Sequence, residues 1–368
     1  MNPLVELQAH GQSFWYDNIR RKLLEDGTLR TLIAADGLRG MTSNPSIFEK
    51  AIGQSDDYDE QMAELVSTGL DTKGIYETMA ITDIQIACDL FADLYARSHG
   101  GDGYVSLEVS PYLARDTEGT VIEAQRLFAA VDRPNLMIKV PATNAGIPAI
   151  RELISAGINV NITLMFSMDH YLAVAQAYID GLNDLRANGG NIRHVASVAS
   201  FFVSRVDSAV DKKLAALDDP AAAALMGKVA VANSRVVYQR FKEIFHGSPF
   251  GELRAAGAPV QRLLWASTST KNPNYLDTLY VDELIGPETV NTMPPQTIEA
   301  FRDHGKPGHS LERDVEKAQL ALDNLAELGI DLDELAEQLQ VDGVDAFASS
   351  FEALLNTISS KAYEMQGR

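Results

Sequence analysis

One lysine, Lys139, interrupts the apolar run from Leu136 to Val140, and its position indicates what chemistry the chain is suited to. Five to six apolar residues with turn signals on both sides are typical of a buried parallel strand. Burial disfavours the charged form of an amine, and a neutral lysine amine attacks a carbonyl carbon to form a Schiff base. The alternative is a structural lysine that snorkels to solvent at the strand end.

Two carboxylates stand at the ends of other predicted strands and suit the same chemistry. Asp17 ends the first predicted strand, and Glu108 lies near the end of the third. One carboxylate can move the protons that dehydrate a carbinolamine, and the other can act on a different carbon of the substrate. The alternatives are a helix cap for Asp17 and a surface strand end for Glu108.

Several neutral polar residues follow the predicted strands. Asn161 and Thr163 alternate along one strand, so they face the same side of it. Asn44 follows another strand, where it is either a helix cap or a ligand for a sugar. Ser200 completes a group of amide and hydroxyl side chains that we expect to bind sugar hydroxyls.

Basic residues complete the predicted site. Arg205, with Lys271 as a companion, would clamp a phosphate group. The seven histidines show no metal-binding spacing, so we expect no metal. The predicted chemistry also requires no redox or nucleotide cofactor.

Strands and helices alternate along the whole chain, which predicts right-handed βαβ units. Eight candidate strands match the number in a (β/α)8 TIM barrel of the α/β class, in which the active site lies at the C-terminal strand ends. We expect one domain over residues 1–368, with additional helices and a C-terminal helical extension. A doubly wound open sheet is the alternative, but no glycine-rich nucleotide motif follows a strand. The predicted strands are 13–17, 37–42, 104–109, 136–140, 158–164, 195–203, 261–266 and 278–281.

Charge and composition restrict the partners. The chain has 51 acidic and 31 basic residues, giving a net charge of −20. This argues against non-specific binding to nucleic acid or an anionic membrane, and it means that an anionic substrate needs local cations. Cys88 is the sole cysteine, so no intramolecular disulfide is possible. With no visible signal sequence and no apolar stretch long enough for a bilayer, we expect a cytoplasmic protein.

Two segments resemble signatures of the transaldolase family. Residues Gly40 to Phe48 resemble its first signature, and Leu136 to Thr143 resemble its Schiff-base signature. The order and spacing of residues 104–109, 159–164 and 200–205 agree with the family as well. The length of the chain and the segment from Trp265 to Pro273 resemble the longer bacterial subfamily.

The resemblance implies a function for each residue already singled out. Lys139 would form the Schiff base, and Glu108 would dehydrate the carbinolamine through a water held by Thr163. Asp17 would take the C4 hydroxyl proton as the C3–C4 bond breaks. The residues implied to bind substrate are Thr42, Asn44, Asn161, Ser200, Phe202, Arg205, Ser267 and Lys271. Shorter relatives place a second phosphate-binding arginine after the seventh strand, where this chain has Ser267, Ser269 and Lys271.

The expected reaction is transfer of a dihydroxyacetone unit from sedoheptulose 7-phosphate or fructose 6-phosphate to an aldose phosphate, by a monomer or homodimer. A Schiff-base aldolase that releases dihydroxyacetone to water is the nearest alternative enzyme. A non-catalytic barrel that binds sugar phosphates is the alternative from another class, but it would not need the lysine and both carboxylates.

Overall fold

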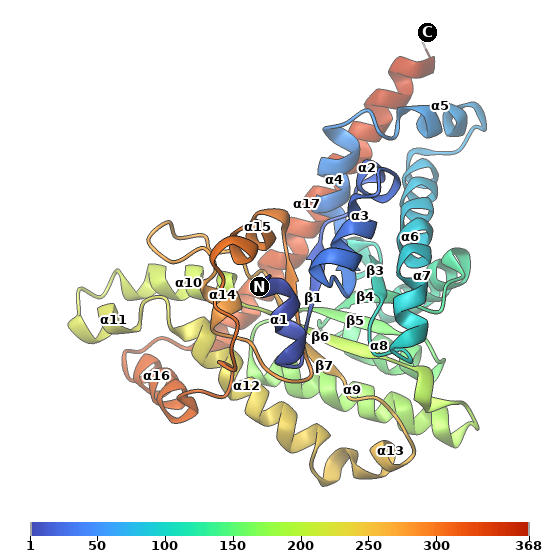
Figure 1. The fold of residues 1–368 in the computed structure, drawn as a ribbon. Helices are drawn as coiled ribbons and strands as arrows, with labels where there is room; N and C mark the ends of the chain where they lie inside the picture. The colour runs from blue at the N-terminus through green and yellow to red at the C-terminus, as the bar shows by residue number, and fades with distance from the viewer. Residues whose placement is uncertain (1, 367–368) are drawn as a thin grey trace.

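Eight parallel strands close into a barrel in the order of the chain, in a computed structural model that describes residues 2–366. This confirms the predicted (β/α)8 barrel and excludes the open sheet. Figure 1 shows the strands at the centre of the helices. The strands are β1 (Gln12–Asp17), β2 (Gly40–Thr42), β3 (Tyr104–Glu108), β4 (Leu136–Pro141), β5 (Val160–Met165), β6 (Ser197–Phe202), β7 (Arg262–Ala266) and β8 (Thr289–Met293).

Helices surround this barrel, and several begin where the sequence supplies a cap. Asn44 accepts a hydrogen bond from the backbone N–H of Ile47, and Pro45 takes the first helical position of α4. The helices are α1 (Pro3–Ala9), α2 (Arg21–Glu25), α3 (Thr28–Thr31), α4 (Pro45–Gly53), α5 (Asp59–Ser67), α6 (Thr72–Arg97), α7 (Thr117–Val131), α8 (Gly146–Ser155), α9 (Met168–Ala187), α10 (Ser204–Leu214), α11 (Pro220–Leu225), α12 (Val229–Phe245), α13 (Gly251–Ala255), α14 (Leu279–Asp282), α15 (Pro295–His304), α16 (Val315–Glu327) and α17 (Leu332–Gln366). Single helical turns are η1 (Leu32–Asp36), η2 (Pro111–Leu113), η3 (Ile192–His194) and η4 (Ser248–Phe250).

The prediction of an eighth strand at residues 278–281 is wrong. These residues form the start of α14, where the Thr278 carbonyl accepts hydrogen bonds from the N–H groups of Val281 and Asp282. The strand that closes the barrel is β8, which pairs with both β1 and β7. Three of the five residues in β8 are polar, so no apolar run marks it in the sequence.

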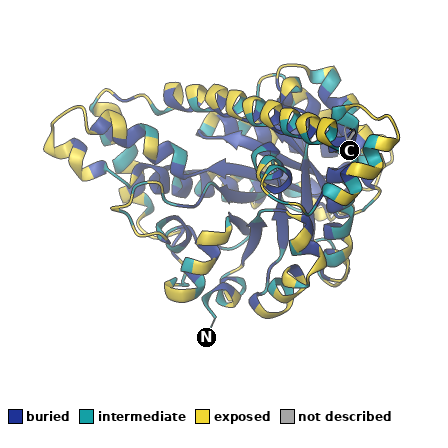
Figure 2. Ribbon diagram, turned by 90° about the horizontal axis from the view of Figure 1, so that it is seen from above, coloured by how far each residue is buried: buried dark blue, intermediate teal, exposed yellow. Residues whose placement is uncertain are grey.

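The barrel strands are buried, whereas the helices expose their outer faces, as Figure 2 shows from above. The last helix, α17, packs against α4, α6 and α10 and also contacts β5. In Figure 1 it is the long red helix that continues past α4 and α5 toward the C-terminus. This placement brings the C-terminal helical extension against the barrel itself.

Candidate active site

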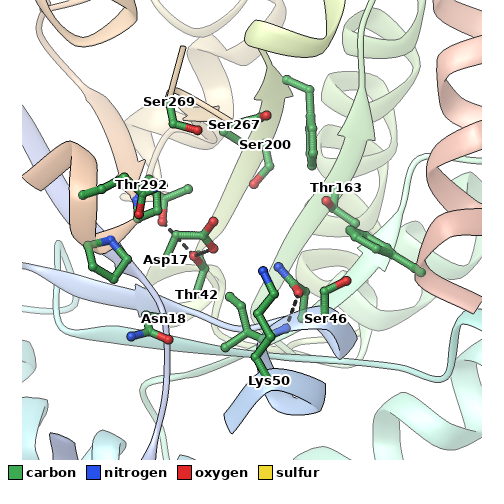
Figure 3. Close-up of a pocket in the computed structure, with 18 of the residues that line it drawn as sticks. Asp17, Asn18, Thr42, Ser46, Lys50, Thr163, Ser200, Ser267, Ser269 and Thr292 are labelled. Atoms are coloured by element: carbon green, nitrogen blue, oxygen red, sulfur yellow. Dashed lines mark hydrogen bonds between the residues drawn. The ribbon is translucent and has the colours of Figure 1, made fainter. Parts of the chain in front are cut away.

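A cavity of about 600 Å³ opens at the C-terminal ends of the strands. It is lined by ten of the twelve residues that the sequence singled out, namely Asp17, Thr42, Asn44, Lys139, Thr163, Ser200, Phe202, Arg205, Ser267 and Lys271. The other two, Glu108 and Asn161, are not among the lining residues, but each contacts one that is. Figure 3 shows Asp17, Thr42 and Thr292 together on one side of the cavity and Thr163 on the other.

Lys139 is buried near the end of β4 and does not snorkel, because its side chain is only 6% exposed. Its Nζ donates a hydrogen bond to the carbonyl oxygen of Ser43, at 3.3 Å, and lies 3.4 Å from Oε2 of Glu108. The register of β3 and β4 pairs Glu108 directly with Lys139, so both side chains point into the barrel. The amine is thus held between a carbonyl and a carboxylate at the edge of the cavity.

Glu108 lies beside Lys139 and is not among the residues that line the cavity. Its side chain is 6% exposed, so it is not a surface strand end. Burial raises the pKa of this carboxyl, and the nearby Lys139 opposes the increase. Oε2 has no hydrogen-bond partner among the described residues. A carboxyl with a raised pKa keeps its proton to a higher pH, which suits a group that must protonate a departing hydroxyl.

Asp17 stands at the end of β1 and faces the cavity. It caps no helix, because the next helix, α2, has Arg20 at its N-cap. Burial raises the pKa of its carboxyl, while Lys139 and a hydrogen bond from Thr42 oppose the increase. Thr42 Oγ1 donates that bond to Oδ1 at 2.7 Å and lies 2.7 Å from Oγ1 of Thr292 on β8. Thr42 on β2 therefore holds Asp17 in place, and Thr292 on β8 holds Thr42.

The inward-facing residues of β5 and β6 form the floor of the cavity. Asn161 donates to Oγ of Ser106 at 2.9 Å and accepts from Oγ of Ser200 at 2.7 Å, so it supports Ser200 from beneath. Thr163, two residues further along β5, lines the cavity, and its buried Oγ1 has no hydrogen-bond partner among the described residues. A buried hydroxyl without a protein partner is available to bind a water molecule or a ligand.

Two cations mark another part of the cavity wall. The guanidinium of Arg205 lies 5.2 Å from the ring centroid of Phe202, and burial lowers its pKa. Lys271 donates to Oγ of Ser269 at 2.6 Å, and burial followed by repulsion from Arg205 lowers its pKa. Neither forms an ion pair with any residue in the described part of the chain. Unpaired cations in a strongly acidic protein are suited to binding an anion.

Several lining residues were not predicted. Ile47, Lys50 and Ala51 lie on one face of α4, with Gln54 at its C-cap, and their spacing of three and four residues after the Asn44 cap was a usable signal. Figure 3 shows Lys50 reaching toward the cavity. Phe347 on α17 had no such signal, because it lies far along the chain from every motif. Residues 2–366 hold no cluster of His, Cys, Asp and Glu side chains suited to a metal ion.

A polar cavity at the C-terminal mouth of a closed barrel places the chain among the (β/α)8-barrel enzymes. Residues 14–358 match the model of one family, described as transaldolase/fructose-6-phosphate aldolase. The chain belongs to this family.

Relatives over the full length agree with that assignment. A transaldolase of Thiobacillus denitrificans is 49% identical over 97% of this chain and 100% of its own length. One from Trichodesmium erythraeum is 45% identical over 99% of this chain and 98% of its own, and one from a Parafrankia species is 49% identical over 97% of each. They confirm the resemblance found in the sequence, and the chain is an enzyme, a transferase of the transaldolase type.

Proposed function

We propose that the chain transfers a dihydroxyacetone unit from sedoheptulose 7-phosphate or fructose 6-phosphate to glyceraldehyde 3-phosphate or erythrose 4-phosphate, with Lys139 as the covalent carrier. This reaction belongs to the non-oxidative branch of the pentose phosphate pathway. The observation that supports it most is the buried Nζ of Lys139, 3.4 Å from Glu108 at the edge of an open polar cavity. An amine held there is desolvated yet accessible to a carbonyl carbon.

The first half of the reaction forms the imine. Nζ of Lys139 adds to C2 of the ketose and gives a carbinolamine. Glu108 supplies a proton to the departing hydroxyl, which leaves as water, and Thr163 holds the water that relays this proton. Two observations support these assignments. Oγ1 of Thr163 has no hydrogen-bond partner among the described residues, and Oε2 of Glu108, 3.4 Å from Nζ of Lys139, has no hydrogen-bond partner there either.

The second half breaks and remakes a carbon–carbon bond. Asp17 takes the proton of the C4 hydroxyl, the C3–C4 bond breaks, and the electron pair passes into the iminium to leave an enamine on Lys139. The aldose leaves, and an acceptor aldose enters. Its aldehyde carbon is attacked by C3 of the enamine, and Asp17 returns the proton to the new hydroxyl. Water then adds to C2 of the new iminium, and the C–N bond breaks to release the product ketose and restore the amine of Lys139. Attraction to Lys139 opposes the rise in the pKa of Asp17 that burial causes, and this helps the Asp17 carboxylate to act as a base.

The remaining lining residues would orient the substrate. Asn44, Thr42 and Ser200 would bind hydroxyls of the three-carbon unit, and Asn161 would act through Ser200. Phe202 would line the pocket. Arg205 would bind the phosphate, with Lys271 and Ser267 as the second anchor. Both cations line the same cavity and repel one another, which an arriving phosphate would relieve.

Borohydride reduction in the presence of fructose 6-phosphate, followed by peptide mass mapping, tests this function. Reduction of the imine leaves a stable adduct on the lysine that carried it. We expect that adduct on Lys139. A protein that converts fructose 6-phosphate without any trapped lysine would contradict the proposal.

A Schiff-base aldolase is the second candidate, because the family description names such an enzyme beside transaldolase. The two differ in what removes the dihydroxyacetone unit from the lysine. We expect product formation from fructose 6-phosphate to depend on an acceptor aldose. Rapid release of free dihydroxyacetone without an acceptor would favour the aldolase.

Three further predictions concern the number of domains, the oligomeric state and the location of the protein. We propose a single domain over residues 1–368, supported by a family match that covers residues 14–358. A monomer or homodimer and a cytoplasmic location stay predictions from the sequence. No helix among residues 2–366 has the length and apolar character that crossing a membrane requires.

Replacing Arg205 with alanine is expected to raise KM for phosphorylated substrates about ten- to a hundredfold, the effect of losing one charge-assisted hydrogen bond. The effect on unphosphorylated fructose should be much smaller, because it has no phosphate to lose. Steady-state kinetics with both donors measure the difference. The Arg186→Ala variant removes the same charge from an exposed position on α9 and controls for the change in net charge. Equal losses for both donors would show a structural role for Arg205.

A further inference from the structure

The last helix places an aromatic ring over the lysine. Phe347 of α17 is 5% exposed and lines the cavity. Its ring centroid lies 5.7 Å from Nζ of Lys139 and 6.0 Å from Cζ of Arg205. The proposed covalent carrier and the proposed phosphate anchor therefore share one apolar wall. The sequence motifs did not reveal this wall, and the mechanism above assigns it no part.

The helix is anchored on both sides of this ring. Before it, the Gln340 amide donates to the carbonyl oxygens of Ala142 and Leu164, at 2.9 and 3.0 Å, at the mouth ends of β4 and β5. After it, Oγ of Ser350 accepts a hydrogen bond from Oγ of Ser46 on α4 at 2.7 Å. Contacts at both ends hold Phe347 in one position instead of leaving it on a loose terminal segment.

One glycine shows how close the helix comes to the barrel. A Cβ atom on Gly343, one turn before Phe347, would lie 2.8 Å from Cδ2 of Leu164 and 3.5 Å from Nη1 of Arg205. The first distance is shorter than any ordinary carbon–carbon contact, so a larger residue would require either the Leu164 side chain or the helix to shift. Glycine at this position lets α17 approach closely enough for Phe347 to cover the lysine.

We propose that Phe347 keeps bulk water away from C3 of the three-carbon enamine on Lys139, and thereby determines how often that unit is transferred instead of being protonated and hydrolysed. This inference rests on the proposed function, since it concerns the intermediate of that reaction. It identifies Phe347 as a shielding residue that governs reaction specificity. Neither Asp17 nor Glu108 can serve this purpose, because both must exchange protons with the substrate.

The two fates of the intermediate begin from the same enamine. In transfer, C3 of the enamine bonds to the aldehyde carbon of the acceptor, whose oxygen takes a proton. In hydrolysis, C3 takes a proton to give an iminium, and water then adds to C2. The resulting carbinolamine collapses, the C–N bond breaks, and dihydroxyacetone leaves with the free amine restored. Transfer also ends with water adding to C2 of the new ketose iminium, so the step that separates the two fates is protonation of C3 of the enamine.

An aromatic ring is well suited to this purpose. It offers no hydrogen bond to hold a water molecule, and it fills space beside the reacting carbon. A ring face within about 6 Å of a cation also stabilises that cation without hydrating it. Because the ring holds no water, the enamine on Lys139 can persist beside Phe347 until an acceptor arrives.

The test measures the ratio of free dihydroxyacetone to sedoheptulose 7-phosphate, with fructose 6-phosphate as donor and erythrose 4-phosphate as acceptor. This ratio compares two fates of one intermediate, so it does not depend on how much of the enzyme is folded. Phe347→Ala should raise the ratio roughly tenfold by admitting water. Phe347→Leu, which keeps a large apolar side chain, should stay near the wild-type ratio, and Phe347→Val should fall between them.

Phe351 supplies a matched control on the same helix, one turn further along. It is 3% exposed and packs edge-on against Tyr76 and Tyr112, and it is not among the residues that line the main cavity. Phe351→Ala loosens the helix without removing the ring above the lysine, so its ratio should stay near wild type while its thermal stability falls.

The remaining outcomes distinguish failure of the inference from failure of the proposed function. An unchanged ratio in both Phe347→Ala and Phe347→Val would overturn the inference, as would an equal increase in Phe351→Ala. Wild-type enzyme that forms no sedoheptulose 7-phosphate would overturn the proposed function itself, and the inference with it. Wild-type transfer with an unaltered ratio in the variants would leave the function standing and remove only the assignment of Phe347.

Discussion

Replacing Lys139 with alanine is expected to abolish both turnover and borohydride trapping, with the largest effect of any single substitution in this chain. We propose Lys139 as the carrier, so the covalent intermediate should not form when its amine is removed. Rates of transfer and mass spectra of the reduced protein measure the two losses. Lys139→Arg is a stringent comparison, because it keeps the charge beside Glu108 but lacks an amine that forms an imine.

Two other lysines line the cavity, so the adduct must be mapped to one of three lysines. Lys50 and Lys271 also reach the space that the ketose would occupy. In the wild-type protein the reduced adduct should map to Lys139 alone, and Lys271→Ala should still be trapped there. An adduct on Lys50 or Lys271, or trapping that survives in Lys139→Ala, would contradict the assignment of the carrier.

Replacing either carboxylate should slow the reaction about a hundredfold to ten-thousandfold, but at different steps. Asp17 lines the cavity and Glu108 lies beside the lysine outside the cavity lining, so we expect the two to serve different protons. Asp17→Ala should form the imine and then cleave slowly, so the full-length ketose adduct accumulates. Glu108→Ala should instead delay imine formation, so every adduct appears late. Rapid-quench borohydride trapping with mass analysis separates the two patterns.

Amide variants help to separate chemistry from packing in this experiment. Asp17→Asn keeps an oxygen that can accept the hydrogen bond of Thr42 but removes the base, so it should behave as Asp17→Ala does. The same argument applies to Glu108→Gln beside Lys139. Loss of the ketose adduct in an Asp17 variant with an intact fold would show that Asp17 acts before cleavage, against the proposed order.

The sequence predicted the barrel because buried parallel strands leave a simple pattern. Seven strands were predicted as short segments beside turn signals, and the apolar run around Lys139 was the clearest of them. The eighth was missed because β8 contains Thr289, Asn291 and Thr292, whose burial depends on partners elsewhere in the chain. The Gln12 side chain, for example, donates to Oγ1 of Thr289, and such a pairing is invisible in a local pattern.

The site was predictable to the extent that strand ends define it. Residues at the ends of strands converge in any closed barrel, so ten of the predicted residues reach the cavity. The sequence did not distinguish residues that line the cavity from those that only contact a lining residue, as Asn161 and Glu108 do. Phe347 was beyond prediction, because only the docking of α17 on the barrel brings it to Lys139.

The placement of α17 also affects when the protein becomes functional during its synthesis. Phe347 comes 54 residues (347 minus 293) after Met293, the last residue of β8. At about 5–20 residues per second, a ribosome needs roughly 3 to 11 s to add them. During that interval all eight strands have been made, but Phe347 has not yet been added and cannot cover Lys139. The nascent chain would therefore pass through a stage in which its reactive amine is open to any aldehyde nearby, and docking of α17 would end that exposure.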